Sequence, residues 1–234
     1  MGRRRFLLLI VNPSATADGT DCVRVANLDF EAKYPQRTWM RNMDKSHLYL
    51  IGDVPGFTPQ IGRLVSMMNY ARYTTLTAVE NLSVEELDYL HDPETNSIGA
   101  LLLHIAAAEA GYQAATFYAR DLTEQERQEW GAALDLGESA RREIRGHELD
   151  YYLSRLQQVR AKTLDELGRR EDQWLEEQTS FGNGQNVNNY FKWFHVFGHE
   201  INHRGQIRWL RTRATRRTVS PFTSRGVKAT LFHH

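Results

Sequence analysis

Residues 195–207 read HVFGHEINHRGQI, with histidines at positions 195, 199 and 203. On a helix, residues four apart lie on one face with Cβ atoms about 5–6 Å apart, so two such histidines can chelate one metal ion. The pairs His195/His199 and His199/His203 both meet this condition. All three cannot easily bind one ion, because eight helical residues rise about 12 Å. Ordinary surface or hydrogen-bonded core histidines are the alternative interpretation.

The same stretch contains the zinc-protease pattern His-Glu-x-x-His at His199-Glu200-x-x-His203. That class of protease also needs a third metal ligand, commonly a Glu or His further along the chain. No Asp or Glu follows His203, and the only later histidines are His233 and His234. The sequence therefore argues against a zinc protease, and it leaves a metal site that lacks one ligand.

Helical periodicity continues outward from this stretch, which lies in a helix predicted over about 187–213. Earlier helices are predicted from Thr58-Pro59, over about 97–119, and around an apolar stripe from Leu149 to Leu167. Thr58 is expected to cap the first helix, and Ser83/Glu86 and Thr123/Glu126 are capping-box patterns. Residues 181–186, FGNGQN, indicate a plain loop. Four long amphipathic helices with little strand signal predict an all-α four-helix bundle.

The two ends of the chain lack this pattern. Residues 1–54 are expected to form an irregular, flexible extension, 55–213 the bundle, and 214–234 a basic and disordered tail. The apolar run Phe6–Val11 is too short for a signal peptide, and no segment is long enough to span a membrane. Cys22 is the only cysteine, so disulfides and thiolate metal sites are not expected. A cytoplasmic protein fits these features.

The balance of 29 Lys and Arg against 29 Asp and Glu indicates no particular class of partner. Eight basic residues and no acidic ones follow His203, but no nucleic-acid-binding motif accompanies them. Nucleic acid is therefore not expected as a partner.

His104 is the candidate for the missing ligand. It lies in the nearly wholly apolar segment 101–109, LLLHIAAAE, on the flank of the stripe formed by Leu101 and Ile105. A lone histidine there is more often a hydrogen-bonded core residue, but a chelating pair that needs a third nitrogen favours a ligand. Three histidines with an open position are typical of a catalytic zinc or nickel site.

Two motifs resemble those of the DinB-like (YfiT-like) metalloprotein superfamily. One is Ser-Ile-Gly-x-Leu-Leu-x-His at 97–104, followed by the acidic residue Glu109; the other is His-x-x-x-His-Arg-Gly-Gln at 199–206. The resemblance covers about residues 55–213. It implies an up-down-down-up four-helix bundle, often a homodimer, with a divalent metal held by His104, His199 and His203. His195 would lie outside the metal's ligand set.

Activities in that superfamily include transfer of sulfur from low-molecular-weight thiols, a thiol-dependent isomerisation and suspected metal-dependent hydrolysis. We therefore expect a metal-dependent enzyme, a thiol S-transferase or a hydrolase, that activates a thiol or a water with Zn²⁺ or Ni²⁺. The expected partner is a small-molecule substrate, for example a low-molecular-weight thiol. The alternatives are a non-catalytic, metal-stabilised binding module and a stress-related protein.

No catalytic residue follows from the sequence, and Cys22 is a poor candidate for a nucleophile. Glu109 points about 140° away from His104 around an ideal helix. This direction indicates that Glu109 supports a metal ligand or makes a contact between helices, and does not itself bind the metal. Gln206, three residues after His203, is in position to orient a ligand or substrate. The aromatic residues of the last helix are expected in core or dimer packing rather than in a pocket: Trp193, Phe194, Phe197 and Trp209.

Overall fold

The computed structural model describes residues 48–181 and 184–218. Cys22, His47 and most of the predicted extension and tail lie outside these residues. The helices are α3 Pro59–Val79, α4 Val84–Leu87, α5 Ile98–Phe117, α6 Glu124–Asp135, α7 Gly137–Glu143, α8 Leu149–Leu167, the 3₁₀ helix η1 Asp172–Glu176, and α9 Asn189–Thr218. The two strands are β1 Gln178–Phe181 and β2 Gln185–Asn188.

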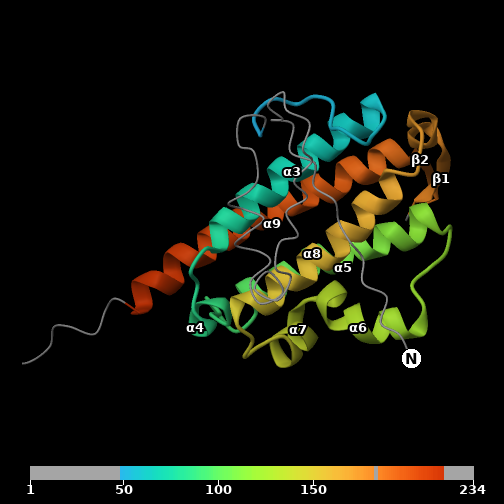
Figure 1. Cartoon of the computed structure of the whole chain (residues 1–234). Helices are drawn as coiled ribbons and strands as arrows, with labels where there is room; N and C mark the ends of the chain where they lie inside the picture. Colours follow the sequence, from blue (N-terminus) through green and yellow to red (C-terminus); the bar gives the residue numbers. More distant parts are fainter. Residues whose placement is uncertain (1–47, 182–183, 219–234) are drawn as a thin grey trace, which may run out of the picture. The chain divides into compact units, whose positions relative to one another are not determined.

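The four long helices α3, α5, α8 and α9 form the bundle. α9 packs against α3 and α5, and α5 also packs against α8. In Figure 1, α3 and α9 run in one direction and α5 and α8 run in the other, so successive helices go up, down, down and up. The prediction of an all-α four-helix bundle is confirmed. α9 continues to Thr218, beyond the end predicted near residue 213.

The helix starts follow local capping chemistry with one exception. Both predicted capping boxes form, Ser83 with Glu86 and Thr123 with Glu126. The Thr58 side chain does not cap α3, contrary to the prediction. Instead Thr58 Oγ1 donates to Asp172, whose carboxylate also accepts the backbone N–H groups of Gln60 and Ile61 at 3.0 and 3.1 Å. The cap of α3 therefore comes from η1, more than a hundred residues further along the chain.

Two connections contain more structure than their sequences indicate. The polar segment after α5 forms α6 and α7, which meet at Leu136 with a φ of 55°. Three residues of the segment predicted as a plain loop, Phe181, Gln185 and Asn186, lie in two antiparallel strands, in which Phe181 pairs with Gln185 and Ser180 with Asn186. The loop prediction failed because these short strands are polar and show no alternation of apolar and polar residues.

The buried face of α8 matches its predicted stripe except at the first member, Leu149, which is only partly buried. The other members are all buried: Tyr152, Leu153, Leu156, Val159, Thr163 and Leu167. Close packing between α5 and α8 explains the glycine of the first motif. A Cβ at Gly99 would lie 2.5 Å from the Tyr152 hydroxyl, so this crossing requires a residue without a side chain.

A buried ion-pair network (Arg72, Glu109, Arg160 and Glu200) joins the four helices, each of which contributes one residue. Arg72 donates to both carboxylates, and so does Arg160. Two positive and two negative charges leave the network neutral, which is the condition under which buried charges are tolerated. Burial opposes a charged Glu109, but Arg160 and Arg72 outweigh it and lower the pKa of this carboxyl.

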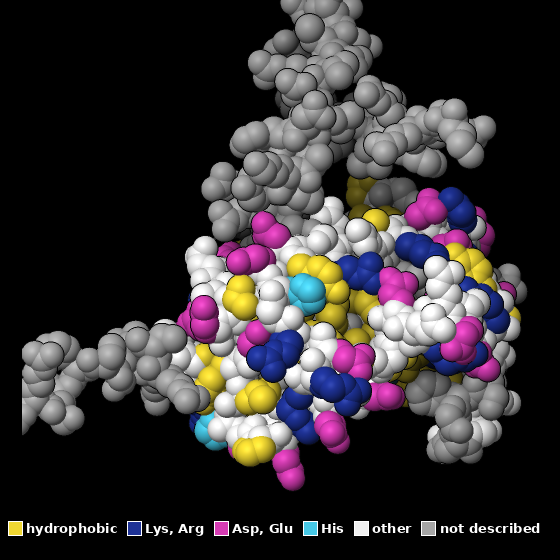
Figure 2. Space-filling view, turned by 90° about the horizontal axis from the view of Figure 1, so that it is seen from below, with side chains coloured by type: hydrophobic (Ala, Val, Ile, Leu, Met, Phe, Trp, Pro, Cys, Tyr) yellow, Lys and Arg dark blue, Asp and Glu magenta, His cyan; other side chains and the backbone are white. Residues whose placement is uncertain are grey.

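The surface in Figure 2 carries Lys and Arg side chains interspersed with Asp and Glu. Among the described helices, none is both long enough and apolar enough to cross a membrane.

Candidate metal centre

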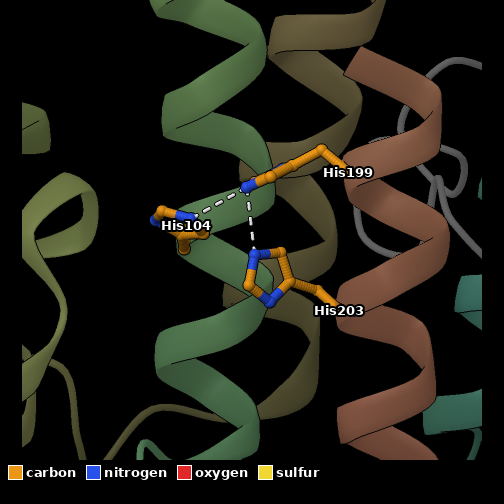
Figure 3. A group of neighbouring side chains, drawn as sticks. All are labelled: His104, His199 and His203. Atoms are coloured by element: carbon orange, nitrogen blue, oxygen red, sulfur yellow. Dashed lines mark hydrogen bonds between the residues drawn. The ribbon is translucent and has the colours of Figure 1, made fainter. Parts of the chain in front are cut away.

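The structure brings His104, His199 and His203 together, and we call them the histidine triad. His104 projects from α5, while His199 and His203 project from successive turns of α9 (Figure 3). His199 Nε2 lies 3.0 Å from His104 Nε2 and 3.0 Å from His203 Nε2. One nitrogen from each ring lies within 4.8 Å of those of the other two, and no other such group occurs among the described residues.

The outer nitrogens of two rings are held by fixed partners. His104 Nδ1 lies 2.8 Å from the carbonyl oxygen of Ala133, which belongs to α6. Since a carbonyl only accepts, this nitrogen carries the proton, and Nε2 presents a lone pair to the triad. His203 Nδ1 lies 2.7 Å from Gln206 Oε1, which selects the same tautomer. Both rings therefore present the nitrogen that a metal requires.

The convergence of these nitrogens fits a cation. With Nδ1 protonated on His104 and His203, only His199 can supply a proton between the three rings, and it can donate to one neighbour at a time. At the other contact, two ring nitrogens that both carry lone pairs face each other at 3.0 Å, which is unfavourable without a cation between them. Three nitrogens bound tetrahedrally to one zinc ion would lie about 3.3 Å apart, given Zn–N bonds of about 2.0–2.1 Å. The two separations from His199 Nε2, 3.0 Å each, are close to this requirement.

Electrostatics also keep the triad neutral. Burial lowers the pKa of His104 and of His203. The pKa of His199 falls to about 3, first through burial and then through the neighbouring His203, His104 and His195. Neutral imidazole is the form that binds metal, so at neutral pH no proton has to be removed before binding.

The other described histidines lie outside this group. His195 is exposed, with its ring 6.0 Å from that of His199 and 5.8 Å from that of Tyr112. His91 contacts Trp209, and His147 stacks on Tyr151. Geometry thus separates His195 from the triad although the helical spacing of four is the same.

The two glutamates beside the motifs belong to the fold rather than to the surface. Glu109 accepts from Arg72, Arg160 and Thr163, so it is the interhelical partner that its position on α5 indicated. Glu200 is fully buried and accepts from both arginines. Neither carboxylate makes a described hydrogen bond to the triad, which argues against a general base at Glu200.

Sequence reasoning missed three supporting groups. The Ala133 carbonyl has no side-chain signature and could not have been found. Arg72 and Arg160 left a signal, because each lies within the buried stripe of its helix, where an unpaired arginine is not tolerated. Two such arginines, with Glu109 and Glu200 on the other helices, indicate a buried network.

Comparison with known proteins places the chain in a family. A family model described as "MST: Mycothiol-S-transferase" matches residues 63–215, which is more than half of the sequence and includes α5, α8 and the triad. No curated protein matches the sequence. The match confirms the resemblance carried by the two motifs, and the chain belongs to the mycothiol S-transferase family, within the DinB/YfiT-like metalloenzyme superfamily.

Proposed function

We propose that this protein is a divalent-metal-dependent S-transferase that joins a low-molecular-weight thiol to an electrophilic small molecule. The observation that supports this most strongly is the convergence of three neutral imidazole nitrogens between α5 and α9, in a chain that belongs to a thiol-transferase family. His104, His199 and His203 would hold the metal. Nitrogen ligands suit Zn²⁺ and Ni²⁺, and three of them leave a position for substrate.

A divalent ion bound at the triad would act as a Lewis acid and favour the thiolate over the thiol. The protein's own groups prepare the site for it. Ala133 and Gln206 orient two of the rings, and burial keeps all three neutral. In the transfer, a C–S bond forms at the electrophilic carbon, the leaving group departs with its bonding electrons, and the thiol proton goes to solvent.

Metal analysis of the purified full-length protein tests the site. We expect stoichiometric zinc or nickel in the wild type, and a large loss in His104→Ala, His199→Ala and His203→Ala. His195→Ala is the matched control, because it removes an imidazole from the same helix outside the triad, and it should retain the metal. Stoichiometric metal in all three triad variants would refute the ligand assignment.

A thiol panel tests the reaction. With 1-chloro-2,4-dinitrobenzene as electrophile, transfer releases chloride and gives a coloured thioether. We expect turnover by the metal-loaded protein and loss of turnover in the triad variants. Turnover of ester substrates without turnover of any thiol would favour a water-activating hydrolase. Bound metal without either activity would favour the non-catalytic module.

Three further expectations belong to this proposal. The resemblance implies a homodimer, which light scattering during size exclusion would test.

The single cysteine and the thiol chemistry favour the cytoplasm. We also expect residues 55–213 to carry the metal site as one domain, since they contain the histidine triad and all of the bundle except the last residues of α9. Limited proteolysis that cut within 55–213 first would argue against that boundary.

A further inference from the structure

The break between α6 and α7 lies three residues after the carbonyl that orients His104. Leu136 ends α6 by donating its backbone N–H to the Ala132 carbonyl at 3.1 Å. It then leads into α7 with a φ of 55° and a ψ of −150°, a conformation that residues other than glycine rarely adopt. Such a conformation persists only where the surrounding structure holds it, and it is often found beside a functional site.

This break separates a carbonyl and an N–H group that would otherwise bond to each other. In an unbroken α-helix each N–H donates to the carbonyl four residues earlier, so Gly137 would donate to Ala133. Instead, Gly137 N donates to the side-chain oxygen of Asn96 at 2.8 Å. The Ala133 carbonyl accepts from His104 Nδ1, also at 2.8 Å. The broken turn therefore supplies the acceptor that orients a triad histidine.

The two groups that replace the helical bond come from one stretch of chain. Asn96 directly precedes Ser97, which caps α5, and His104 lies about two turns further along that helix. The start of α5 thus holds the two halves of the broken turn apart. Asn96 takes the N–H group of one half, and His104 takes the carbonyl of the other.

A closed turn at Leu136 is the competing arrangement. It would return Leu136 to the helical region, which removes the strain, and it would pair Gly137 N with the Ala133 carbonyl. A helical carbonyl points along the helix axis, so His104 Nδ1 would lose its acceptor. Asn96 favours the open turn, because it gives the Gly137 N–H group a partner there.

We propose that Asn96 is a positioning residue for the metal centre. By accepting from Gly137, it reserves the Ala133 carbonyl for His104, and this carbonyl fixes the tautomer in which His104 Nε2 presents its lone pair to a metal. Asn96 acts through α6 and makes no described hydrogen bond to the triad. The proposal rests on the metal site of the proposed function, and it is independent of which thiol or electrophile reacts.

The ring-nitrogen chemical shifts of His104 test this role in the metal-free full-length protein, because protonated and unprotonated nitrogens have well-separated ¹⁵N shifts. The spectra are recorded at a pH of about 7.5, where histidine is neutral, and the signals are assigned with His104→Ala. In the wild type Nδ1 should carry the proton. In Asn96→Ala the two shifts should move towards each other as the tautomers mix. Asn96→Asp keeps an acceptor oxygen and should resemble the wild type.

Metal affinity provides a second readout. Asn96→Ala should weaken Zn²⁺ binding about 10–100-fold, as is usual when the partner of a metal-binding histidine is lost. Competition with a chromogenic chelator measures this change, and Asn96→Asp should restore most of the affinity. Asn96→Leu keeps the side-chain volume without an acceptor, and it should behave as Asn96→Ala does if the smaller residue prevents folding. A purely structural role would lower the free energy of unfolding and leave the tautomer and affinity of the folded protein unchanged.

Two controls separate this role from the other surroundings of Asn96. Asn96 lines a cavity of about 610 Å³ together with Asn202 and Trp209. Trp209 therefore lines a pocket, contrary to the expectation that it would serve only in packing. Asn202→Ala removes another amide from this cavity. Ser139→Ala removes the hydrogen bond from its hydroxyl to the Leu136 carbonyl, 3.1 Å long, at the same corner. Both variants should keep the wild-type tautomer and affinity.

A single tautomer with the proton on Nδ1 and wild-type zinc affinity in Asn96→Ala would overturn the proposal. Equal losses in Ser139→Ala or Asn202→Ala, or no rescue by Asn96→Asp, would also overturn it. If the wild type binds no metal, the proposed metal site fails. The His104 tautomer in the metal-free variants then still decides whether Asn96 controls the Ala133 carbonyl.

Discussion

Arg72 on α3 and Glu200 on α9 share two hydrogen bonds, from Nε to Oε1 at 2.8 Å and from Nη2 to Oε2 at 3.3 Å. Glu200 directly follows His199, so this contact fixes the turn of α9 that presents a triad histidine. Arg72 Nη1 also donates to the Leu156 carbonyl of α8, and Arg160 Nη1 donates to the Met68 carbonyl of α3. The network therefore sets how the helices that carry the triad lie against α3 and α8.

Glu200→Gln should destabilise the protein by about 3–5 kcal/mol, because it leaves two buried arginines with one carboxylate. The measurement is the free energy of unfolding in urea. Glu138→Gln, at an exposed position of α7, is the control and should change stability by less than about 0.5 kcal/mol. A Glu200→Gln protein as stable as the control would show that the stability of the network does not depend on its second carboxylate.

Gly99→Ala should cost about 1–3 kcal/mol, since the new Cβ would lie 2.5 Å from the Tyr152 hydroxyl and overpack the contact between α5 and α8. Gly111→Ala is a matched control within the same helix, where a Cβ meets nothing within 4 Å. There alanine should raise stability by up to about 1 kcal/mol through helix propensity. In thermal and urea unfolding, the change in the free energy of unfolding should therefore have opposite signs for the two variants. The same sign for both variants would contradict the packing argument.

Gln206→Leu should weaken metal affinity about 10–100-fold, because it removes the oxygen that accepts from His203 Nδ1 and fixes the ring and its tautomer. Competition with a chromogenic chelator measures the affinity. Gln206→Glu keeps an acceptor at this place and should lose much less. Arg208→Leu, at an exposed position of the same helix, should bind as the wild type does. Wild-type affinity in Gln206→Leu would show that the hydrogen bond does not support the site.

The fold followed from the sequence where the signal is local, whereas the choice of the pair His199/His203 over His195/His199 rested on the resemblance to a known family. Periodic apolar stripes gave the long helices, and the capping boxes at Ser83 and Thr123 mark helix starts as predicted. The sequence failed where the partner is distant. Asp172 caps α3 across the fold, and the Ala133 carbonyl orients His104 without any side-chain signature. His104 was a candidate only because a chelating pair on the last helix needed a third nitrogen, since a lone histidine in an apolar segment is more often a hydrogen-bonded core residue.

Metal-free protein should lose stability as the pH is lowered, and His199 should account for part of the loss. Its pKa is about 3 in the folded state against 6.5 for a free side chain. Between these values the unfolded chain binds a proton that the folded chain does not, so protonation favours unfolding. The contribution of neutral His199 to stability is fully present above pH 6.5, and it is lost as the pH falls towards the folded-state pKa of about 3.

Urea unfolding of the metal-free protein at pH values of about 7.5 and 5.5 measures this effect. The wild type should be less stable at the lower pH, and the difference should shrink in His199→Gln, which removes the group. It should not vanish, because burial also lowers the pKa of His104 and His203. His195→Gln, at an exposed position one turn earlier on α9, is the control and should retain most of the wild-type difference, because His195 is the smallest of the named causes that lower the pKa of His199. An unchanged pH dependence in His199→Gln would contradict the assignment, because the proton taken up on unfolding would then belong to another group.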